Sequence, residues 1–302
     1  MNQQTLKHSY LFEGKGLHTG LYSHMTVSPA DPGTGIRFRR TDVSQDAWVF
    51  ALAENVSNTA RSTTLSMNGV SVSTVEHILS ALTGLGVDNA VIDIDNAEVP
   101  ILDGSARPYV EAIVPDGLAD QGVERHYIDI KGEITVTDAE SGAYVTISPA
   151  DAPSFDLTVD FNSRVLGVQH AHWDENVAYA EEIGPCRTFV FFHEIAYLAS
   201  LNLVKGGDVD NAIVVVEQPV TDSQVDSLCT LFGKERLAVN ENGYLNNLEL
   251  RFPDECGRHK LLDLIGDLRL AGGYLNAKVT AYKSGHTINT NAAKALREAL
   301  NK

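Results

Sequence analysis

Histidine and carboxylate side chains occur together in two segments of this sequence that both read as helices. In Glu76-His77, the histidine is a candidate metal ligand and the glutamate a candidate general base. His259, Asp263 and Asp267 are spaced four residues apart, which places them roughly on one helix face with a drift of about 80° over the span. A catalytic zinc site usually has three protein ligands and a water molecule, so these residues are candidates for one centre.

Each of these motifs also has a structural explanation. A single Glu-His pair at a helix start is more often structural than catalytic, and the two aspartates have an alternative role as solvated or capping charges. Leucines on the same face oppose that role, because a carboxylate near a core requires a partner. Spacing alone favours Asp263 over Asp267 as the ligand beside His259, because eight residues rise about 12 Å along a straight helix.

A third histidine, His286, comes just after a predicted strand that ends at Tyr282. Loops at strand ends commonly carry catalytic side chains, so His286 is a further candidate. Other catalytic motifs are incomplete in this sequence. His193-Glu194 lacks the second histidine of HExxH, and residues 14–20 (GKGLHTG) miss the dinucleotide-binding spacing by one residue, so we interpret them as a turn.

The elements that must position these residues belong to a weak internal repeat. Residues 25–31 (MTVSPAD) and 145–151 (VTISPAD) match 120 residues apart, and each reads as a strand ending at Ser-Pro. Residues 77–84 (HILSALTG) and 259–266 (HKLLDLIG) match as helices, and Ser73 or Thr74 is placed to cap the first. Chance explains either match alone more easily than both in the same order.

The repeat predicts two similar domains, residues 1–120 and 121–302, separated near a linker at Pro115–Val123. Two related domains that face each other would bring His77 and His259 together at their interface, where ligand sites preferentially lie. The sequence therefore predicts an α+β protein in which each domain is a β-sheet layered with α-helices.

The second half has 62 more residues between its repeat strand and its repeat helix than the first half has. This extra segment contains a predicted helix at Phe189–Leu201 and a predicted strand at Ala212–Val216. From composition alone, we expect these apolar residues simply to pack in a hydrophobic core.

Composition and charge narrow the classes of function. The 302 residues are 43% hydrophobic and 21% charged, which is ordinary for globular domains, and the formal charge of −17 disfavours nucleic acid and anionic membrane surfaces as partners. We find no signal peptide and no run of about 20 apolar residues. Three widely spaced cysteines indicate neither disulfides nor a thiolate site, so we expect a cytoplasmic protein.

These features coincide with one family. The chain resembles the zinc-dependent UDP-3-O-acyl-N-acetylglucosamine deacetylases of lipid A biosynthesis from about Gln4 to about Asn289, in order and without large gaps. The segments that carry the resemblance include long and unusual runs, notably the HKxxDxxGD run. They are residues 14–20, 73–79, 88–89, 100–106 (PILDGSA), 187–189 (RTF), 205–207 (KGG), 210–212 (DNA), 259–267 and 283–286.

The resemblance implies a fold and a set of catalytic residues. The family fold has two similar domains, and its second domain carries a βαβ insert, at about 189–217 here, that forms an apolar acyl tunnel. The implied reaction is hydrolysis of the N-acetyl group of UDP-3-O-acyl-N-acetylglucosamine with a Zn²⁺ cofactor. The implied roles are as follows: zinc ligands His77, His259 and Asp267; general base Glu76; general acid His286 supported by Asp263; and oxyanion donor Thr188.

The resemblance also implies how the substrate is held. Lys260 would meet the nucleotide diphosphate, with Arg258 nearby. The residues expected against the acyl chain are Leu17, Phe161, Phe189, Ile195, Val204, Ala212 and Val214. We expect a monomer without a membrane span. Three alternatives remain open: a zinc deacetylase for a different acyl sugar, an inactive binding protein with the same fold, and the deacetylase part of a longer fused enzyme.

Overall fold

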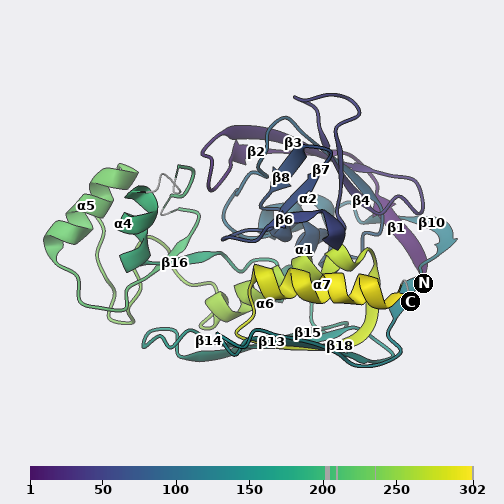
Figure 1. Cartoon of the computed structure of the whole chain (residues 1–302). Coiled ribbons are helices and arrows are strands. Elements are labelled where there is room, and N and C mark those ends of the chain that lie inside the picture. The colour runs from purple at the N-terminus through teal and green to yellow at the C-terminus, as the bar shows by residue number, and fades with distance from the viewer. Residues whose placement is uncertain (201–204, 209, 235, 301–302) are drawn as a thin grey trace.

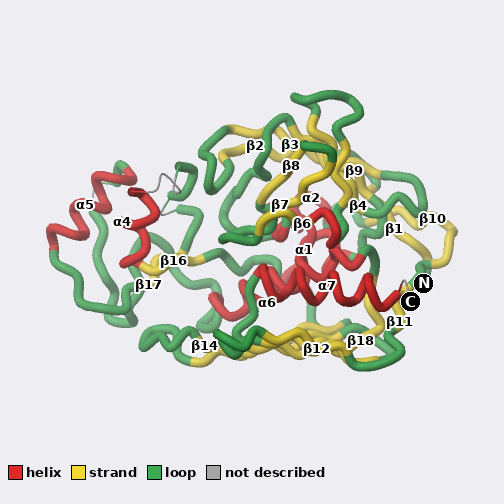
Figure 2. The backbone as a smooth tube through the Cα atoms, viewed as in Figure 1, coloured by secondary structure: helices red, strands yellow, loops and turns green. Residues whose placement is uncertain are grey.

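The structure, a computed structural model, describes residues 1–200, 205–208, 210–234 and 236–300 (Figure 1). Two β-sheets enclose a central layer of helices (Figure 2). The first unit has the strand order β2 (Tyr10–Lys15), β3 (Tyr22–Pro29), β9 (Ala90–Ile94), β4 (Ile36–Arg40) and β5 (Trp48–Phe50). The second unit has the order β12 (Ile134–Thr137), β13 (Tyr144–Pro149), β18 (Tyr274–Tyr282), β14 (Ser154–Asp160) and β15 (Val168–Asp174), and β11 (Tyr127–Asp129) also pairs with β18.

The two sheets repeat one topology. In each, the central strand pairs parallel with one neighbour, β9 with β4 and β18 with β14, and antiparallel with the other, β3 or β13. The matched sequences of residues 25–31 and 145–151 lie at the ends of β3 and β13. The predicted α+β class with two similar sheet-and-helix units is therefore confirmed.

The remaining elements complete the two units and the insert. A small sheet of three strands, β6 (Val56–Asn58), β7 (Thr64–Met67) and β8 (Val70–Ser73), flanks the first unit, and β1 (Asn2–Leu6) pairs with β10 (Leu118–Glu124). The expected linker at 115–123 thus overlaps a strand. The helices are α1 (Glu76–Leu85), α2 (Arg107–Ile113), α3 (Tyr179–Glu182), α4 (Phe192–Ser200), α5 (Asp222–Phe232), α6 (Glu255–Leu268) and α7 (His286–Leu300), with short 3₁₀ turns at Ala53–Asn55 and Arg269–Ala271. None of the helices within the described ranges is long and apolar enough to cross a membrane.

The extra segment of the second half forms a βαβ insert at one end of the molecule (Figure 1). Strand β16 (Phe189–Phe191) pairs parallel with β17 (Ile213–Val215), and α4 follows β16 directly. The prediction of a helix from Phe189 is wrong for its first three residues. These residues form β16, and the helix begins at Phe192. Helix α5 was not predicted; a capping box at Thr221 starts it and Gly233, in a left-handed conformation, ends it.

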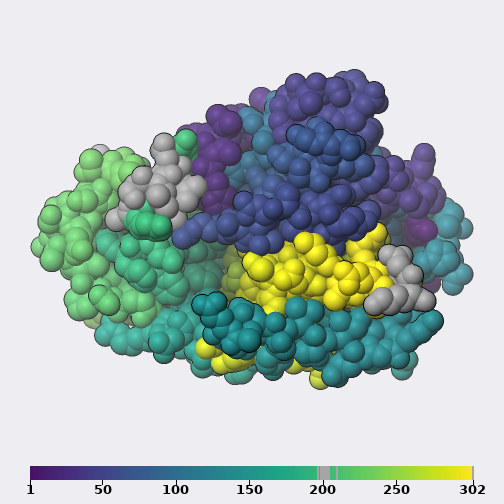
Figure 3. Space-filling view, viewed as in Figure 1, coloured from purple at the N-terminus to yellow at the C-terminus, as the bar shows by residue number. Residues whose placement is uncertain are grey.

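The two helices that carry the repeat, α1 and α6, cross between the units at very close range. A Cβ atom built on Gly266 of α6 would overlap the backbone oxygen of Glu76 in α1. Apolar side chains of both helices belong to one continuous core, including Leu79 and Leu82 of α1 and Leu262 of α6. Helix α7 fills the space between the first unit and the second sheet (Figure 3).

The start of α1 differs from the sequence prediction. Its N-cap residue is Val75, which makes no side-chain capping bond. The hydroxyl of Ser73 donates instead to the Ala97 carbonyl, and that of Thr74 donates to the Glu98 carboxylate. The predicted side-chain cap does not form, because both hydroxyls donate to acceptors outside the helix.

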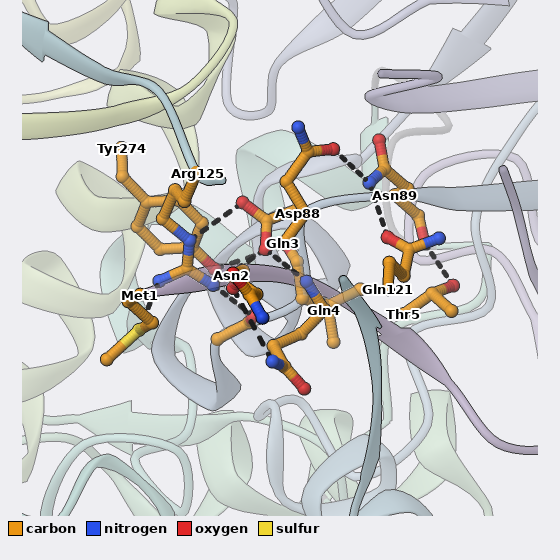
Figure 4. Close-up of polar contacts among 12 residues, drawn as sticks. Met1, Asn2, Gln3, Gln4, Thr5, Asp88, Asn89, Gln121, Arg125 and Tyr274 are labelled. Carbon is orange, nitrogen blue, oxygen red and sulfur yellow. Dashed lines mark hydrogen bonds and ion pairs between the residues drawn. The ribbon is translucent and has the colours of Figure 1, made fainter. Parts of the chain in front are cut away.

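A polar cluster around β1 joins the units at the end away from the insert (Figure 4). Asp88 accepts a hydrogen bond from the Gln4 backbone at 2.7 Å and two from Arg125 at 2.8 and 2.7 Å. The Arg125 guanidinium lies 4.0 Å from the ring centroid of Tyr274 in β18, and the Tyr274 hydroxyl donates towards the Val87 carbonyl at 3.1 Å. Buried charges remain stable only when paired and hydrogen-bonded, so this cluster fixes the two units at a second place.

The close crossing of α1 and α6 leads to a stability prediction. Gly266→Ala forces the helices apart, and overpacking of this kind lowers the free energy of unfolding by about 1–3 kcal/mol or more. Gly132→Ala is the matched control, because a Cβ there meets no atom within 4 Å. Urea unfolding followed by circular dichroism measures both. Equal stability of the two variants would contradict the described crossing.

Candidate metal centre and active site

Three buried side chains from the two units converge on one point. His77 comes from the first turn of α1, and His259 and Asp263 come from successive turns of α6. The Oδ1 atom of Asp263 lies 3.7 Å from Nε2 of His77 and 3.5 Å from Nε2 of His259, and the two imidazole rings meet edge to face at 5.0 Å between centroids. In the part of the chain that the structure describes, this is the one such group with metal-ligand geometry.

The donor atoms fit a divalent metal ion. Ligand atoms about 2.0–2.2 Å from a tetrahedral ion lie about 3.3–3.6 Å apart, close to the separations seen here. Asp263 Oδ1 is buried and has no hydrogen-bond partner among the described residues, as expected of an oxygen reserved for an ion. Its other oxygen accepts a bond from Lys260 Nζ at 2.8 Å, and Nδ1 of His259 contacts the Cys186 carbonyl at 3.0 Å. Such outer contacts orient metal ligands.

The electrostatics favour the forms of these side chains that bind metal. Burial, reinforced by the neighbouring His259, lowers the pKa of His77 to about 3, and burial also lowers the pKa of His259. Burial acts to raise the pKa of Asp263, but the nearby positive charge, that of Lys260 first, outweighs it and holds that pKa below its ordinary value. Two neutral imidazoles and one carboxylate result, which are the required ligand states.

Asp267, which the family resemblance assigned as the third ligand, lies elsewhere. Its carboxylate is fully buried and accepts bonds from Thr63 Oγ1 at 2.6 Å, from Asn289 Nδ2 at 3.0 Å and from His286 Nδ1 at 2.9 Å. The geometry thus places Asp263, and not Asp267, beside the two histidines. The physical reason is the helix rise: four residues keep Asp263 within one turn of His259, whereas eight residues carry Asp267 about 12 Å along the axis.

His286 and Glu76 face each other beside the three donors. Nε2 of His286 lies 3.9 Å from Glu76 Oε1 and 3.9 Å from Asp263 Oδ2. Burial acts to lower the pKa of His286, but Asp267, Asp263 and Glu76 together raise it to about 9. Burial raises the pKa of Glu76 to about 8, and its Oε2 accepts the Thr63 backbone N–H at 3.0 Å. A buried acid–base pair with pKa values displaced towards neutrality or above is typical of proton-transfer sites.

A cavity under the insert, with a mainly apolar lining, adjoins this group. It is lined by Thr188 and Phe189 together with four further residues expected there, Leu17, Ile195, Ala212 and Val214, and ionisable side chains also line it, namely His18, Arg61, Glu194 and Asp208. The ring of Phe189 lies 6.4 Å from that of His259, which connects the cavity to the metal centre. Two expectations differ: Phe161 does not line the cavity but packs edge-on against Phe189, and Val204 lies outside the described residues.

Each cationic residue expected near a diphosphate also pairs with a carboxylate. Lys260 is partly buried and bonds Asp263, while Arg258 pairs with Asp254 at 2.8 Å and with Glu182 and stacks on Phe252. Arg258 therefore belongs to the far side of α6. Sequence reasoning also missed Thr63 and Asn289, which hold Asp267. The position of Asn289, three residues after His286 on one helix, was an available signal.

Comparison with known proteins agrees with this arrangement. A family model described as LpxC, UDP-3-O-acyl N-acetylglycosamine deacetylase, matches residues 3–227 and 233–298. The bifunctional enzyme LpxC/FabZ of Porphyromonas gingivalis is 43% identical over 298 residues, covering 99% of this chain and 64% of that protein. Its counterpart in Bacteroides thetaiotaomicron is 40% identical over 300 residues, covering 99% and 65%. The chain thus spans slightly less than two thirds of the length of these bifunctional relatives.

A relative of similar length to this chain leads to the same assignment. The UDP-3-O-acyl-N-acetylglucosamine deacetylase of Saccharophagus degradans is 42% identical over 292 residues, which cover 96% of this chain and 88% of that protein. The family is a metalloenzyme family, and the described chain has a His/Asp site of matching chemistry. From a match over nearly its whole length, the chain belongs to the UDP-3-O-acyl-N-acetylglucosamine deacetylase family.

Proposed function

We propose that this protein hydrolyses the N-acetyl group of UDP-3-O-acyl-N-acetylglucosamine, releasing acetate and the free glucosamine derivative, an early step of lipid A biosynthesis. The names of its relatives support the substrate. The observation that carries the proposal is the convergence of His77, His259 and Asp263 beside the Glu76–His286 pair at an apolar cavity. A metal centre, an acid–base pair and an acyl site are the three parts that this reaction requires.

We assign the metal ligands as His77, His259 and Asp263, and the metal as Zn²⁺. Two imidazole nitrogens and one carboxylate oxygen form a donor set that suits zinc and leaves a fourth position open. When bound, the ion would polarise the acetamide carbonyl and lower the pKa of a water molecule towards about 7. Lys260, which bonds the second oxygen of Asp263, holds that carboxylate in place.

Glu76 and His286 move the protons on opposite sides of the bond that breaks. Glu76 Oε1 accepts the proton of the attacking water, and its raised pKa makes it a stronger base than an exposed glutamate. His286 Nε2 donates a proton to the departing amide nitrogen, which is a poor leaving group when unprotonated. Asp267 accepts from Nδ1 and keeps the ring cationic, the role that the resemblance had given to Asp263.

The remaining contacts hold the substrate. The hydroxyl of Thr188, which lines the cavity beside Phe189, donates to the oxyanion that develops on the carbonyl. The acyl chain occupies the cavity against Phe189, Leu17, Ile195, Ala212 and Val214. Lys260 has three N–H donors, of which one bonds Asp263, so two remain for a diphosphate oxygen.

The proposed enzyme acts as a monomer in the cytoplasm. One chain supplies every residue of the site, so a second copy adds nothing that the chemistry requires. The three cysteines are free thiols, the state that a reducing compartment maintains.

Alanine replacement separates the two aspartates of α6. Asp263→Ala removes a ligand and its metal affinity falls by more than the about 10–100-fold typical of losing an outer contact. Asp267→Ala keeps near-stoichiometric metal but loses turnover, because His286 is no longer held cationic. Metal analysis after dialysis, beside acetate release, measures both. Retention of metal by Asp263→Ala and its loss from Asp267→Ala would reverse the assignment.

The acid–base pair gives a kinetic prediction. Glu76→Gln and His286→Ala each lower kcat by about 10²–10⁴-fold while the bound metal is unchanged. Exposed residues of the same types provide controls, Glu13→Gln and His172→Ala, and these retain wild-type rates. A chelator abolishes acetate release by the wild-type protein, and added Zn²⁺ restores it. Turnover within a few-fold of wild type in either variant of the pair would refute its role.

The cavity predicts selectivity for acyl length. Each buried methylene contributes about 0.8 kcal/mol, or a factor of about four in affinity. Ala212→Phe fills part of the cavity, so kcat/KM falls steeply for a long-acyl substrate and little for a short one. Ala139→Phe, in an exposed turn of the second unit, is the control. Equal losses for both substrates would argue against an acyl site at Ala212.

A further inference from the structure

A buried carboxylate in the first unit has no part in the proposed reaction. Glu98 is 1% exposed and follows β9 by four residues. Its Oε1 accepts the backbone N–H of His18 at 2.9 Å and the hydroxyl of Thr74 at 3.0 Å. Its Oε2 accepts the backbone N–H and the hydroxyl of Thr19 at 2.8 and 2.7 Å. Four donors satisfy a charge that burial alone would make costly, so the carboxylate ties together the segments that supply them.

The first of these segments is the loop at residues 16–21. The Gly16 N–H donates to the Leu21 carbonyl at 2.9 Å, and the Gly20 N–H donates to the Gly16 carbonyl at 3.0 Å. A Cβ atom on Gly16 would overlap the carboxylate of Glu98. The loop therefore folds tightly around the carboxylate, and glycine is required at its start for that approach.

This loop forms one wall of the apolar cavity. Leu17 and His18 line the cavity together with residues of the insert. The insert rests directly on the loop backbone, because the Gly206 N–H donates to the Leu17 carbonyl at 3.2 Å and a Cβ on Gly206 would overlap the Gly16 carbonyl. The position of Leu17 thus depends on how Glu98 holds the loop.

The second segment leads into the catalytic helix. Thr74 precedes Glu76 and His77 by two and three residues and has a left-handed backbone with φ of 58°. Its hydroxyl bond to Glu98 is one of the contacts that hold the chain in this conformation as it enters α1. One carboxylate therefore contacts both the cavity wall and the segment that presents the general base and a metal ligand.

We propose that Glu98 is a positioning residue that fixes the Leu17–His18 wall of the cavity relative to Glu76 and His77, and thereby sets how tightly the acyl chain is held. The inference rests on the proposed deacetylase function. Glu98 belongs neither to the cavity lining nor to the group of candidate metal ligands, and it acts through the loop that it binds.

Glu98→Gln tests the proposal with little change in size. One acceptor oxygen becomes an N–H₂ group that faces existing donors, so the loop loses at least one of its bonds. We expect kcat/KM for a long-acyl substrate to fall by about tenfold or more, mainly through KM, with a change within about threefold for a short-acyl substrate. Glu111→Gln, at an exposed glutamate of the same unit, leaves both substrates unchanged.

A double-mutant cycle identifies the route of the effect. Leu17→Ala weakens the wall directly, so adding Glu98→Gln to it costs much less than Glu98→Gln costs in the wild type. Equal losses for long and short substrates, or additive losses in the cycle, would overturn the proposal. If Glu98→Gln does not fold, Thr19→Val removes one donor and gives a smaller shift in the same direction; an unchanged length profile in that variant also overturns it. Failure of the wild type to release acetate from either substrate would instead refute the proposed function.

Discussion

The whole site depends on the close crossing of α1 and α6. The backbone of Glu76 lies where a side chain on residue 266 would have to be, so the first turn of α1 packs directly against the last turn of α6. The metal ligands come from both helices, and no element of either unit alone carries them all. The proposed metal site therefore exists only where the two units meet. The continuous core and the Arg125–Asp88–Tyr274 cluster hold the units in that arrangement.

The charges around this crossing explain how an acidic protein would accommodate the proposed anionic substrate. Asp263 and Asp267 are balanced by Lys260 and His286. A metal ion bound by the proposed ligands would add further positive charge at the same place. Because interactions in a buried site are screened far less than those on the surface, this local balance outweighs the distant charges that produce the overall −17.

Much of the fold was predictable because the sequence repeats. Matching strand and helix segments at two offsets predicted the paired units, and the meeting of His77 with His259 followed from their equivalent positions. The roles of Asp263 and Asp267 were harder to predict. Helical spacing favoured Asp263 as the ligand, while the family resemblance favoured Asp267, and only the positions of Thr63 and Asn289 show where Asp267 is held.

Other features escaped prediction for different physical reasons. Phe189–Phe191 is a strand because it pairs with β17 more than twenty residues later, and a helical pattern of apolar residues cannot reveal such a partner. Thr74 is well placed as a helix cap, yet its hydroxyl bonds Glu98, which lies 24 residues away in sequence. Helix α5 has a low content of apolar residues on its exposed side, so its capping box was its clearest signal.

Backbone contacts join the insert to the catalytic frame, in addition to side-chain contacts such as that of Phe161 with Phe189. The carbonyl of Gly104 accepts a hydrogen bond from the Thr188 N–H at 2.8 Å. Gly104 has a φ of 83°, and a Cβ atom there would overlap the Asn211 carbonyl. Gly206 approaches the backbone of Gly16 in the same manner on the other side of the cavity. Backbone contacts of this kind fix the insert without constraining which side chains line it. Substitution at positions such as Ala212 can therefore reshape the cavity while the three metal-ligand candidates keep their geometry, so the proposed function predicts that acyl selectivity and hydrolysis are separable.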